Sequence, residues 1–235
     1  MDTEPDTIAA RVRTVRDEIH RAAIRTGRVP DTIRLVAVSK TVSVERLREA
    51  VDAGIRHVGE NRLQEALPKI EALGRDGVVW HFIGALQRRK VKSVVGRFDT
   101  IHSVDSLALA EEIDRRAQEA SLRQRVLLEV NLGGEVSKEG FEPGALVAVL
   151  SSLNGLKHLD IRGLTAIPPP SPTAEDARPY FRQLRELAQR LTAQGCGNIN
   201  MQELSMGMSH DYQVAVEEGA TYVRVGTAIF GARCD

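Results

Sequence analysis

The chain has 235 residues, of which 42% are hydrophobic and 27% charged, as in an ordinary soluble globular protein. Its formal net charge is zero at pH 7, so no global electrostatic field attracts nucleic acid or an anionic membrane. No apolar run approaches the roughly 20 residues of a membrane-spanning helix, and the amino-terminus has no signal-peptide pattern, so we expect a cytoplasmic protein without membrane or nucleic-acid partners.

Strand-like and helix-like segments alternate along the first half of the chain. Residues 7–27 predict a leading amphipathic helix, and residues 34–38 (RLVAV) predict a short buried strand. Gly54 suits the end of the next helix, because glycine tolerates the backbone conformation of a helix C-cap. Further strands are predicted at residues 56–59, 78–83 and 100–104, and helices at residues 44–53, 63–73, 88–95 and 107–120.

The second half of the chain continues this alternation. Residues 125–131 (RVLLEVN) form the clearest predicted strand. The proline-rich stretch IPPPSPT, at residues 167–173, predicts a stiff loop between a strand and a helix. Further strands are predicted at residues 158–166, 203–206 and 222–225, and helices at residues 143–153, 174–194 and 212–218.

Eight predicted strands, separated by helices, indicate parallel pairing, because parallel neighbours need a long crossover connection. Eight such units predict an α/β fold: a single (β/α)8 TIM barrel domain over residues 1–235, with an extra N-terminal helix. An open doubly wound sheet is the alternative. It is weakened because no glycine-rich dinucleotide-binding turn follows the first strand.

Lys40 is the first candidate for chemistry, because it directly follows a buried strand. Binding sites of such barrels form at the carboxyl ends of the strands. Partial burial there disfavours the ammonium form and leaves a nucleophilic amine. The alternative is a lysine that extends to solvent from a strand end. Of the other lysines, Lys69, Lys90 and Lys92 fall in predicted helices, and Lys138 and Lys157 fall in loops.

The seventh and eighth strand ends carry groups that suit a phosphate. Gly226 and Thr227 offer backbone N–H groups and a hydroxyl, and Ser205 and Ser209 add hydroxyls from the preceding loop. Barrels often bind phosphate at these two loops. The alternative is a pair of tight turns that need glycine and serine for their conformation.

Arg224 lies two residues before Gly226 on an apolar strand, so we expect it to point towards the site. A guanidinium cannot give up its proton. Placed against a pyridine nitrogen, it would keep that nitrogen unprotonated. The alternative is an arginine paired with a carboxylate of the barrel, such as Glu203.

Several long motifs then match one family in order along nearly the whole chain. They are LVAVSK at 35–40, HVGENRLQEA at 57–66, WHFIGALQRRK at 80–90, VNLGGEVSKEGF at 130–141, LSMGMSHDYQVAVEEGA at 204–220 and VRVGTAIFGAR at 223–233. With these motifs the chain resembles the pyridoxal phosphate homeostasis proteins (the YggS/PROSC family). The resemblance implies a fold like the N-terminal barrel domain of alanine racemase. It also implies a protein that binds pyridoxal 5′-phosphate (PLP) and buffers it or delivers it to apo-enzymes.

The resemblance assigns roles to individual positions. The lysine of VSK implies that Lys40 holds PLP as a Schiff base, and the arginine of VRVG implies that Arg224 faces the pyridine nitrogen. Arg89 departs from the family pattern, in which asparagine is frequent, and we expect it to affect the rim of the site. The phosphate would be held by Ser209, Gly226 and Thr227, and the pocket would include Asn61 and His81, with roles left open.

Substantial amino-acid turnover is not expected. Alanine racemases add a second domain that supplies a tyrosine base, whereas this chain ends soon after its eighth strand. Of its three tyrosines, Tyr180 falls in a helix and Tyr222 in a strand core. Tyr212 follows the seventh loop; a place near the rim of the site is the alternative, and a surface position on a helix is expected. Without a positioned base, proton transfer at a substrate carbon is poor.

Three functions are therefore weighed. The first is a non-catalytic PLP carrier, expected as a monomer or weak dimer, since its site needs no residue of a second subunit. The second is a small PLP enzyme such as a weak amino-acid racemase. The third is a Schiff-base aldolase that uses Lys40 on a sugar phosphate. No metal site is predicted, because Cys196 and Cys234 lack metal-ligand spacing and are expected to be reduced.

Overall fold

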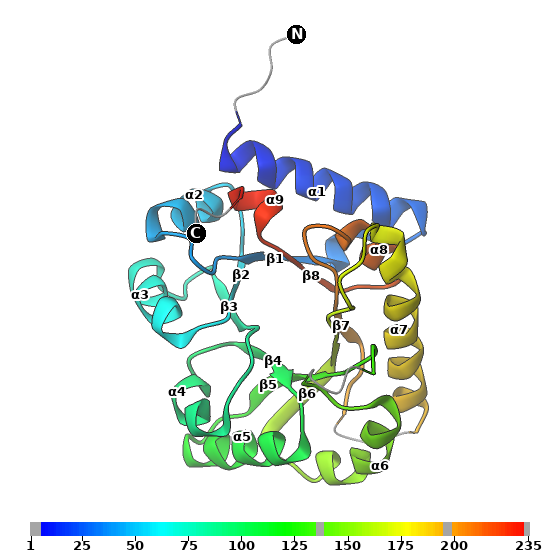
Figure 1. Cartoon of the computed structure of the whole chain (residues 1–235). Helices are drawn as coiled ribbons and strands as arrows, with labels where there is room; N and C mark the ends of the chain where they lie inside the picture. Colours follow the sequence, from blue (N-terminus) through cyan, green and yellow to red (C-terminus); the bar gives the residue numbers. More distant parts are fainter. Residues whose placement is uncertain (1–5, 135–138, 195–198, 233–235) are drawn as a thin grey trace.

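A closed barrel of parallel strands forms the centre of the molecule (Figure 1). The computed structural model describes residues 6–134, 139–194 and 199–232, so Lys138, Cys196 and Cys234 lie outside the described residues. Eight strands pair in chain order from β1 to β8, and β1 pairs with both β2 and β8. The predicted (β/α)8 barrel is confirmed, and the open-sheet alternative is excluded by this closure.

The strands are short and rich in apolar residues, as parallel strands covered on both faces require. Each overlaps its predicted segment. The second strand lies one residue later than predicted, which brings Glu60 into the strand. The strands are β1 (Arg34–Val38), β2 (His57–Glu60), β3 (Val79–Phe82), β4 (Thr100–Val104), β5 (Gln124–Glu129), β6 (Leu159–Thr165), β7 (Glu203–Ser205) and β8 (Tyr222–Val225).

Helices surround the barrel, and two predicted ones differ in detail. The segment predicted at 88–95 divides into a 3₁₀ turn (Arg88–Lys90) and a short α4 (Val91–Val94). The segment predicted at 174–194 begins as a 3₁₀ turn (Ala174–Ala177), before Pro179 in the first turn of α7. Besides α4, the α-helices of the described residues are α1 (Ile8–Arg25), α2 (Val44–Asp52), α3 (Leu63–Leu73), α5 (Leu107–Glu119), α6 (Pro143–Asn154), α7 (Arg178–Ala193), α8 (Tyr212–Glu217) and α9 (Thr227–Phe230), with a further 3₁₀ turn at Pro30–Thr32.

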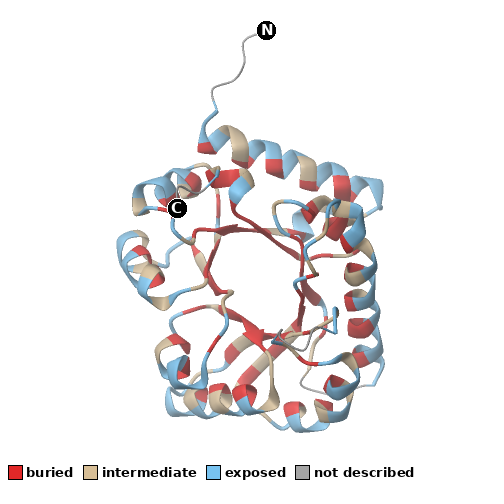
Figure 2. Ribbon diagram, in the orientation of Figure 1, coloured by how far each residue is buried: buried red, intermediate tan, exposed pale blue. Residues whose placement is uncertain are grey.

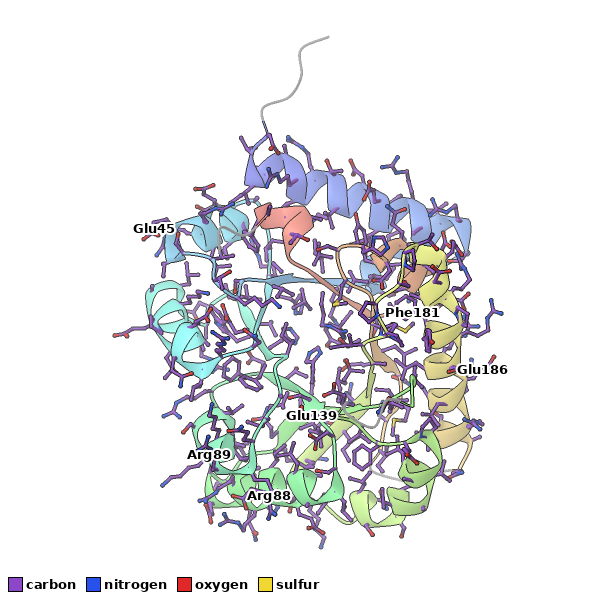
Figure 3. All side chains as sticks on the ribbon, viewed as in Figure 1. Glu45, Arg88, Arg89, Glu139, Phe181 and Glu186 are labelled. Atoms are coloured by element: carbon purple, nitrogen blue, oxygen red, sulfur yellow. The ribbon has the colours of Figure 1, made fainter. Side chains whose placement is uncertain are left out.

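The hydrophobic core lies between the strands and the inner faces of the helices (Figure 2). Helix α7 shows the pattern, because its buried residues recur at the spacing of one helical face. Phe181 is fully buried and turns towards the barrel, whereas Glu186 turns to solvent (Figure 3). Across the described residues, no helix is long and apolar enough to cross a membrane.

The position expected for Tyr212 is wrong. Instead of a surface place, the side chain is only 5% exposed, and its hydroxyl donates a hydrogen bond to Glu18 of α1. The cause is the extra N-terminal helix, which packs against α8 and α9 along the outside of the barrel (Figure 1). Tyr222 does lie in a strand core, as predicted, with 1% of its surface exposed.

Candidate functional site

A cavity of about 370 Å³ is lined by residues that lie at or just after the carboxyl ends of β1, β2, β3, β6, β7 and β8. Its volume is in the range of small-molecule sites in proteins. The exposed side chains of Ile167 and Met208 are part of its lining. Of the residues predicted for the site, six line this cavity: Lys40, Asn61, Ser209, Arg224, Gly226 and Thr227.

The backbone around Lys40 is held on both sides. Before it, the Ser39 N–H donates to the carbonyl of Gly59 (3.0 Å), and the Ser39 carbonyl accepts from the N–H of Val42 (3.0 Å). After it, Thr41 has a left-handed backbone (φ 64°) that non-glycine residues seldom adopt. The Thr41 N–H donates to a carboxylate oxygen of Glu65 (2.7 Å), which stabilises this turn. Lys40, half-buried, thus extends from a fixed point.

A buried ion pair lies directly behind this turn. The Nζ atom of Lys69 donates to Glu60 Oε1 (2.6 Å) and to the carbonyl of Ser39 (2.6 Å). The Ser39 hydroxyl donates to the same Glu60 oxygen (2.5 Å). Burial raises the pKa of Glu60, and the hydrogen bonds from Lys69 and Ser39 oppose this. The residue before Lys40 is therefore fixed by a charged group of α3.

Sequence reasoning missed Lys69, because a lysine in a helix is usually a solvated residue. A signal was present: Lys69 lies on the same face of α3 as Ala66 and Leu73, one turn away in each direction. A charged residue on an apolar helix face needs a buried partner.

Arg224 is almost completely buried, yet it lines the cavity. Within residues 6–134, 139–194 and 199–232 it forms no ion pair. Four acceptors hold its guanidinium: Thr165 Oγ1 (2.9 Å), the carbonyl of Ser205 (2.7 Å), Ser205 Oγ (2.6 Å) and the carbonyl of Ala166 (3.0 Å).

The alternative partner considered for Arg224 is wrong, because Glu203 pairs with Arg34 instead (3.0 Å). Burial lowers the pKa of Arg224 to about 10, and the charges of Glu129 and Asp211 oppose that effect. The guanidinium therefore stays protonated at neutral pH and brings a fixed positive charge to the cavity.

The wall formed by the last two strand ends carries N–H groups close together. The hydroxyl oxygen of Ser209 accepts from the N–H of Gly226 (3.1 Å) and of Ala228 (3.3 Å). Thr227, between them, is exposed. Clustered backbone N–H groups and hydroxyls suit the oxygens of a phosphate.

Asn61 adds an open polar group. Its carboxamide oxygen is buried and accepts no hydrogen bond from the described part of the chain. The backbone of Asn61 packs closely against Gly84, where a larger residue would not fit: a Cβ on Gly84 would lie 2.3 Å from the backbone carbonyl oxygen of Asn61. A buried acceptor in a cavity wall is expected to meet a donor from a ligand or water.

His81 and Ser205 do not line this cavity. His81 is fully buried inside the barrel, between the rings of His57 and His102, so its expected place in the pocket wall is corrected. The reason is its place in the strand. His81 lies one residue before the carboxyl end of β3, and its side chain points into the barrel, where it meets His57 and His102. Arg89 also lies away from the cavity wall, exposed at the start of the α4 segment (Figure 3).

Comparisons with known proteins decide the family. The family model described as alanine racemase, N-terminal domain, matches residues 9–234. A pyridoxal phosphate homeostasis protein of Aquifex aeolicus is 46% identical over 223 residues, which is 95% of this chain and 97% of that protein. The chain belongs to the pyridoxal phosphate homeostasis protein family. The family predicted from the motifs is therefore confirmed.

Solved structures share the barrel. PipY of Synechococcus elongatus, a structure with PLP bound, is 41% identical, with a TM-score of 0.84 over 96% of this chain and 100% of that chain. An alanine racemase of Clostridium difficile is 15% identical, with a TM-score of 0.72 over 96% of this chain and 60% of that chain. The likeness to the racemase concerns the fold alone.

Glu129, at the end of β5, is a further ionisable group of the barrel in this homeostasis-family chain. Burial raises its pKa to about 7. The charge of Arg224 opposes this shift, whereas Asp105 and Glu139 add to it; Glu139 lies in the loop after β5 (Figure 3). A carboxyl group that is protonated in the folded protein but not in the unfolded chain makes stability depend on pH.

We expect Lys69→Met to destabilise the protein by about 3–5 kcal/mol, because it leaves the carboxylate of Glu60 buried without its cation. Urea unfolding at pH 8 measures this. Lys157→Ala, in an exposed loop, is the matched control and should change stability by less than about 0.5 kcal/mol. A loss below about 1 kcal/mol for Lys69→Met would contradict the importance of the pair.

We also expect Glu129→Gln to change how stability depends on pH. From the ordinary pKa of 4.5 up to about 7, the carboxyl ionises in the unfolded chain but stays protonated in the fold, so stability falls as pH rises. The variant should equal the wild type at pH 4 and exceed it by roughly 2–4 kcal/mol at pH 8. Exposed Glu186→Gln is the control. Equal stabilities at pH 8 would show that the pKa of Glu129 is not raised in the fold.

Proposed function

We propose that the protein, as one barrel domain over residues 1–235, holds PLP in the 370 Å³ cavity through a Schiff base on Lys40. The observation that carries this proposal is the placement of Lys40 and the buried cation Arg224 in the wall of one cavity. The PLP-bound PipY structure, 41% identical, supports it. We further propose that the protein buffers PLP in the cytoplasm and delivers it to apo-enzymes, as a monomer or weak dimer.

The residues present fit this cofactor at three points. PLP supplies an aldehyde that condenses with amines. Nζ of Lys40 would form the C=N bond to the aldehyde carbon, with release of one water molecule. Arg224, a donor only, would face the ring nitrogen and keep it unprotonated. The groups of Ser209, Gly226 and Thr227 would hold the phosphate, and Asn61 offers its open carboxamide.

The same arrangement favours holding over turnover. An unprotonated ring nitrogen withdraws electrons weakly, so the cofactor stabilises a carbanion poorly. The described residues that line the cavity include no tyrosine, and the Tyr212 hydroxyl is engaged with Glu18 on the outside of the barrel. One observation favours the alternative of a weak racemase: the exposed side chain of His210 lines the cavity and could accept a proton.

Lys40→Ala should lose covalent capture of PLP. The wild type, incubated with PLP and then borohydride, is expected to carry the reduced cofactor on Lys40, as found by peptide mass spectrometry. The variant should carry none, and the visible absorption of the bound cofactor should disappear. Lys157→Ala, an exposed loop lysine, is the control and should label like the wild type. Labelling of another lysine in Lys40→Ala, at the wild-type yield, would refute the site.

Turnover separates the carrier from the racemase. The PLP-loaded protein should change the chirality of L-amino acids at rates far below the order of 1 s⁻¹ typical of enzymes. Chiral chromatography, with parallel assays for keto acid and carbon dioxide, measures this. If turnover reached ordinary enzyme rates and His210→Ala abolished it, the racemase function would replace the carrier function.

A further inference from the structure

Three imidazoles form a continuous hydrogen-bonded chain inside the barrel, ending at Arg224. His57 Nδ1 lies 3.0 Å from His81 Nε2, and His81 Nδ1 lies 2.9 Å from His102 Nε2. His102 Nδ1 then lies 3.0 Å from the hydroxyl of Ser205, which is 2.6 Å from the guanidinium of Arg224. The five residues of this hydrogen-bonded chain come from five strands of the barrel: β2, β3, β4, β7 and β8.

This chain of hydrogen bonds runs from the end of the barrel where the strands begin to the cavity at the other end. His57, at the start of β2, is partly exposed and lines a separate hollow together with Arg34. His81 and His102 are buried, and their rings meet the ring of Tyr222 edge-on at 5.5 and 5.6 Å between centroids. Polar rings in a barrel core are costly unless their nitrogens are hydrogen-bonded. Here each nitrogen of the two buried rings has a partner.

The direction of these hydrogen bonds follows from the donor at one end. A guanidinium only donates, so Ser205 Oγ accepts from Arg224. In the ranges that the structure covers, the only remaining partner of the Ser205 hydroxyl is His102 Nδ1, so the hydroxyl donates there. His102 must then carry its proton on Nε2 and donate to His81, which in turn donates from Nε2 to His57.

The reverse direction is disfavoured for two reasons. It would leave the hydrogen of the buried Ser205 hydroxyl without an acceptor, at a cost comparable to a lost hydrogen bond. It would also turn the N–H end of His102 towards the positive charge of Arg224 instead of its lone pair. Burial keeps the rings neutral, because it lowers the pKa of His57 to about 4 and that of His81 and His102 well below the usual range.

We propose that Arg224 imposes one direction on the chain His57–His81–His102, and that this chain, through Ser205, positions the guanidinium for the ring nitrogen of PLP. The three histidines and Ser205 are then positioning residues, which act through Arg224. The direction of the chain is independent of any ligand. The positioning role rests on the proposed function.

The direction is tested by ¹⁵N NMR of the full-length, cofactor-free protein labelled at histidine. We expect His57, His81 and His102 to carry their protons on Nε2, with Nδ1 of each accepting a hydrogen bond. Slowly exchanging Nε2–H signals should come from the two buried rings. Histidine protons on Nδ1 in His81 or His102 would overturn the proposal, and this measurement needs no variant to fold.

Ser205→Ala tests the link to Arg224, with Ser103→Ala as its matched control. Ser103 is another buried serine, on β4, whose hydroxyl has no partner in the described residues. In Ser205→Ala the Nδ1 signal of His102 should move to that of a nitrogen without a hydrogen bond, and in Ser103→Ala it should stay. An unmoved signal in Ser205→Ala would overturn the link.

Retention of PLP tests the positioning role in the same two variants. We expect Ser205→Ala to weaken PLP retention roughly three- to tenfold, the effect of one imperfect hydrogen bond, and Ser103→Ala to leave it unchanged. Unchanged retention in Ser205→Ala would overturn the positioning role. If the wild type itself captured no PLP, the proposed function would fail, and the positioning role with it, while the direction measured without cofactor would stand.

Discussion

The candidate site depends on a buried ion pair that does not itself line the cavity. Lys69 joins the carboxylate of Glu60 to the carbonyl of Ser39, and so fixes the residue from which Lys40 extends. Buried ion pairs seldom add net stability over apolar residues of the same volume. This ion pair contributes position instead. It ties the end of β1 to β2 and α3, so that the flexible side chain of Lys40 begins at a defined place.

The closure of the barrel supplies the second half of the arrangement. Because β1 pairs with β8, Val36 lies beside Arg224, and the turn at Lys40 lies beside the start of α9 at Thr227. The amine of Lys40 and the hydroxyl of Thr227, which are distant along the chain, thereby lie on the two sides of one strand pair. The guanidinium of Arg224 reaches the same cavity from the barrel interior, held by neutral acceptors of β6 and β7.

Much of this could be predicted from single segments. Apolar runs located the strands, and the position of Lys40 after a buried strand indicated a cavity residue. What could not be predicted depends on contacts between distant segments. The burial of Tyr212 depends on where α1 packs, and the place of His81 depends on partners from two other strands. The burial of Lys69 could have been predicted from the sequence, since its helix face is apolar. Its partner Glu60 could not, because that contact joins two separate elements.

The pairing of β1 with β8, called the seam here, has a consequence for how the protein folds. Of the eight strands of the barrel, these two are the first and the last to be synthesised. The cavity therefore cannot form until the barrel has closed, and pairing between strands so distant along the chain is slow. A ligand that contacts both sides of the seam binds the closed state alone. By mass action such a ligand would oppose opening of the barrel at this strand pair, so its binding would stabilise the cavity that contains it.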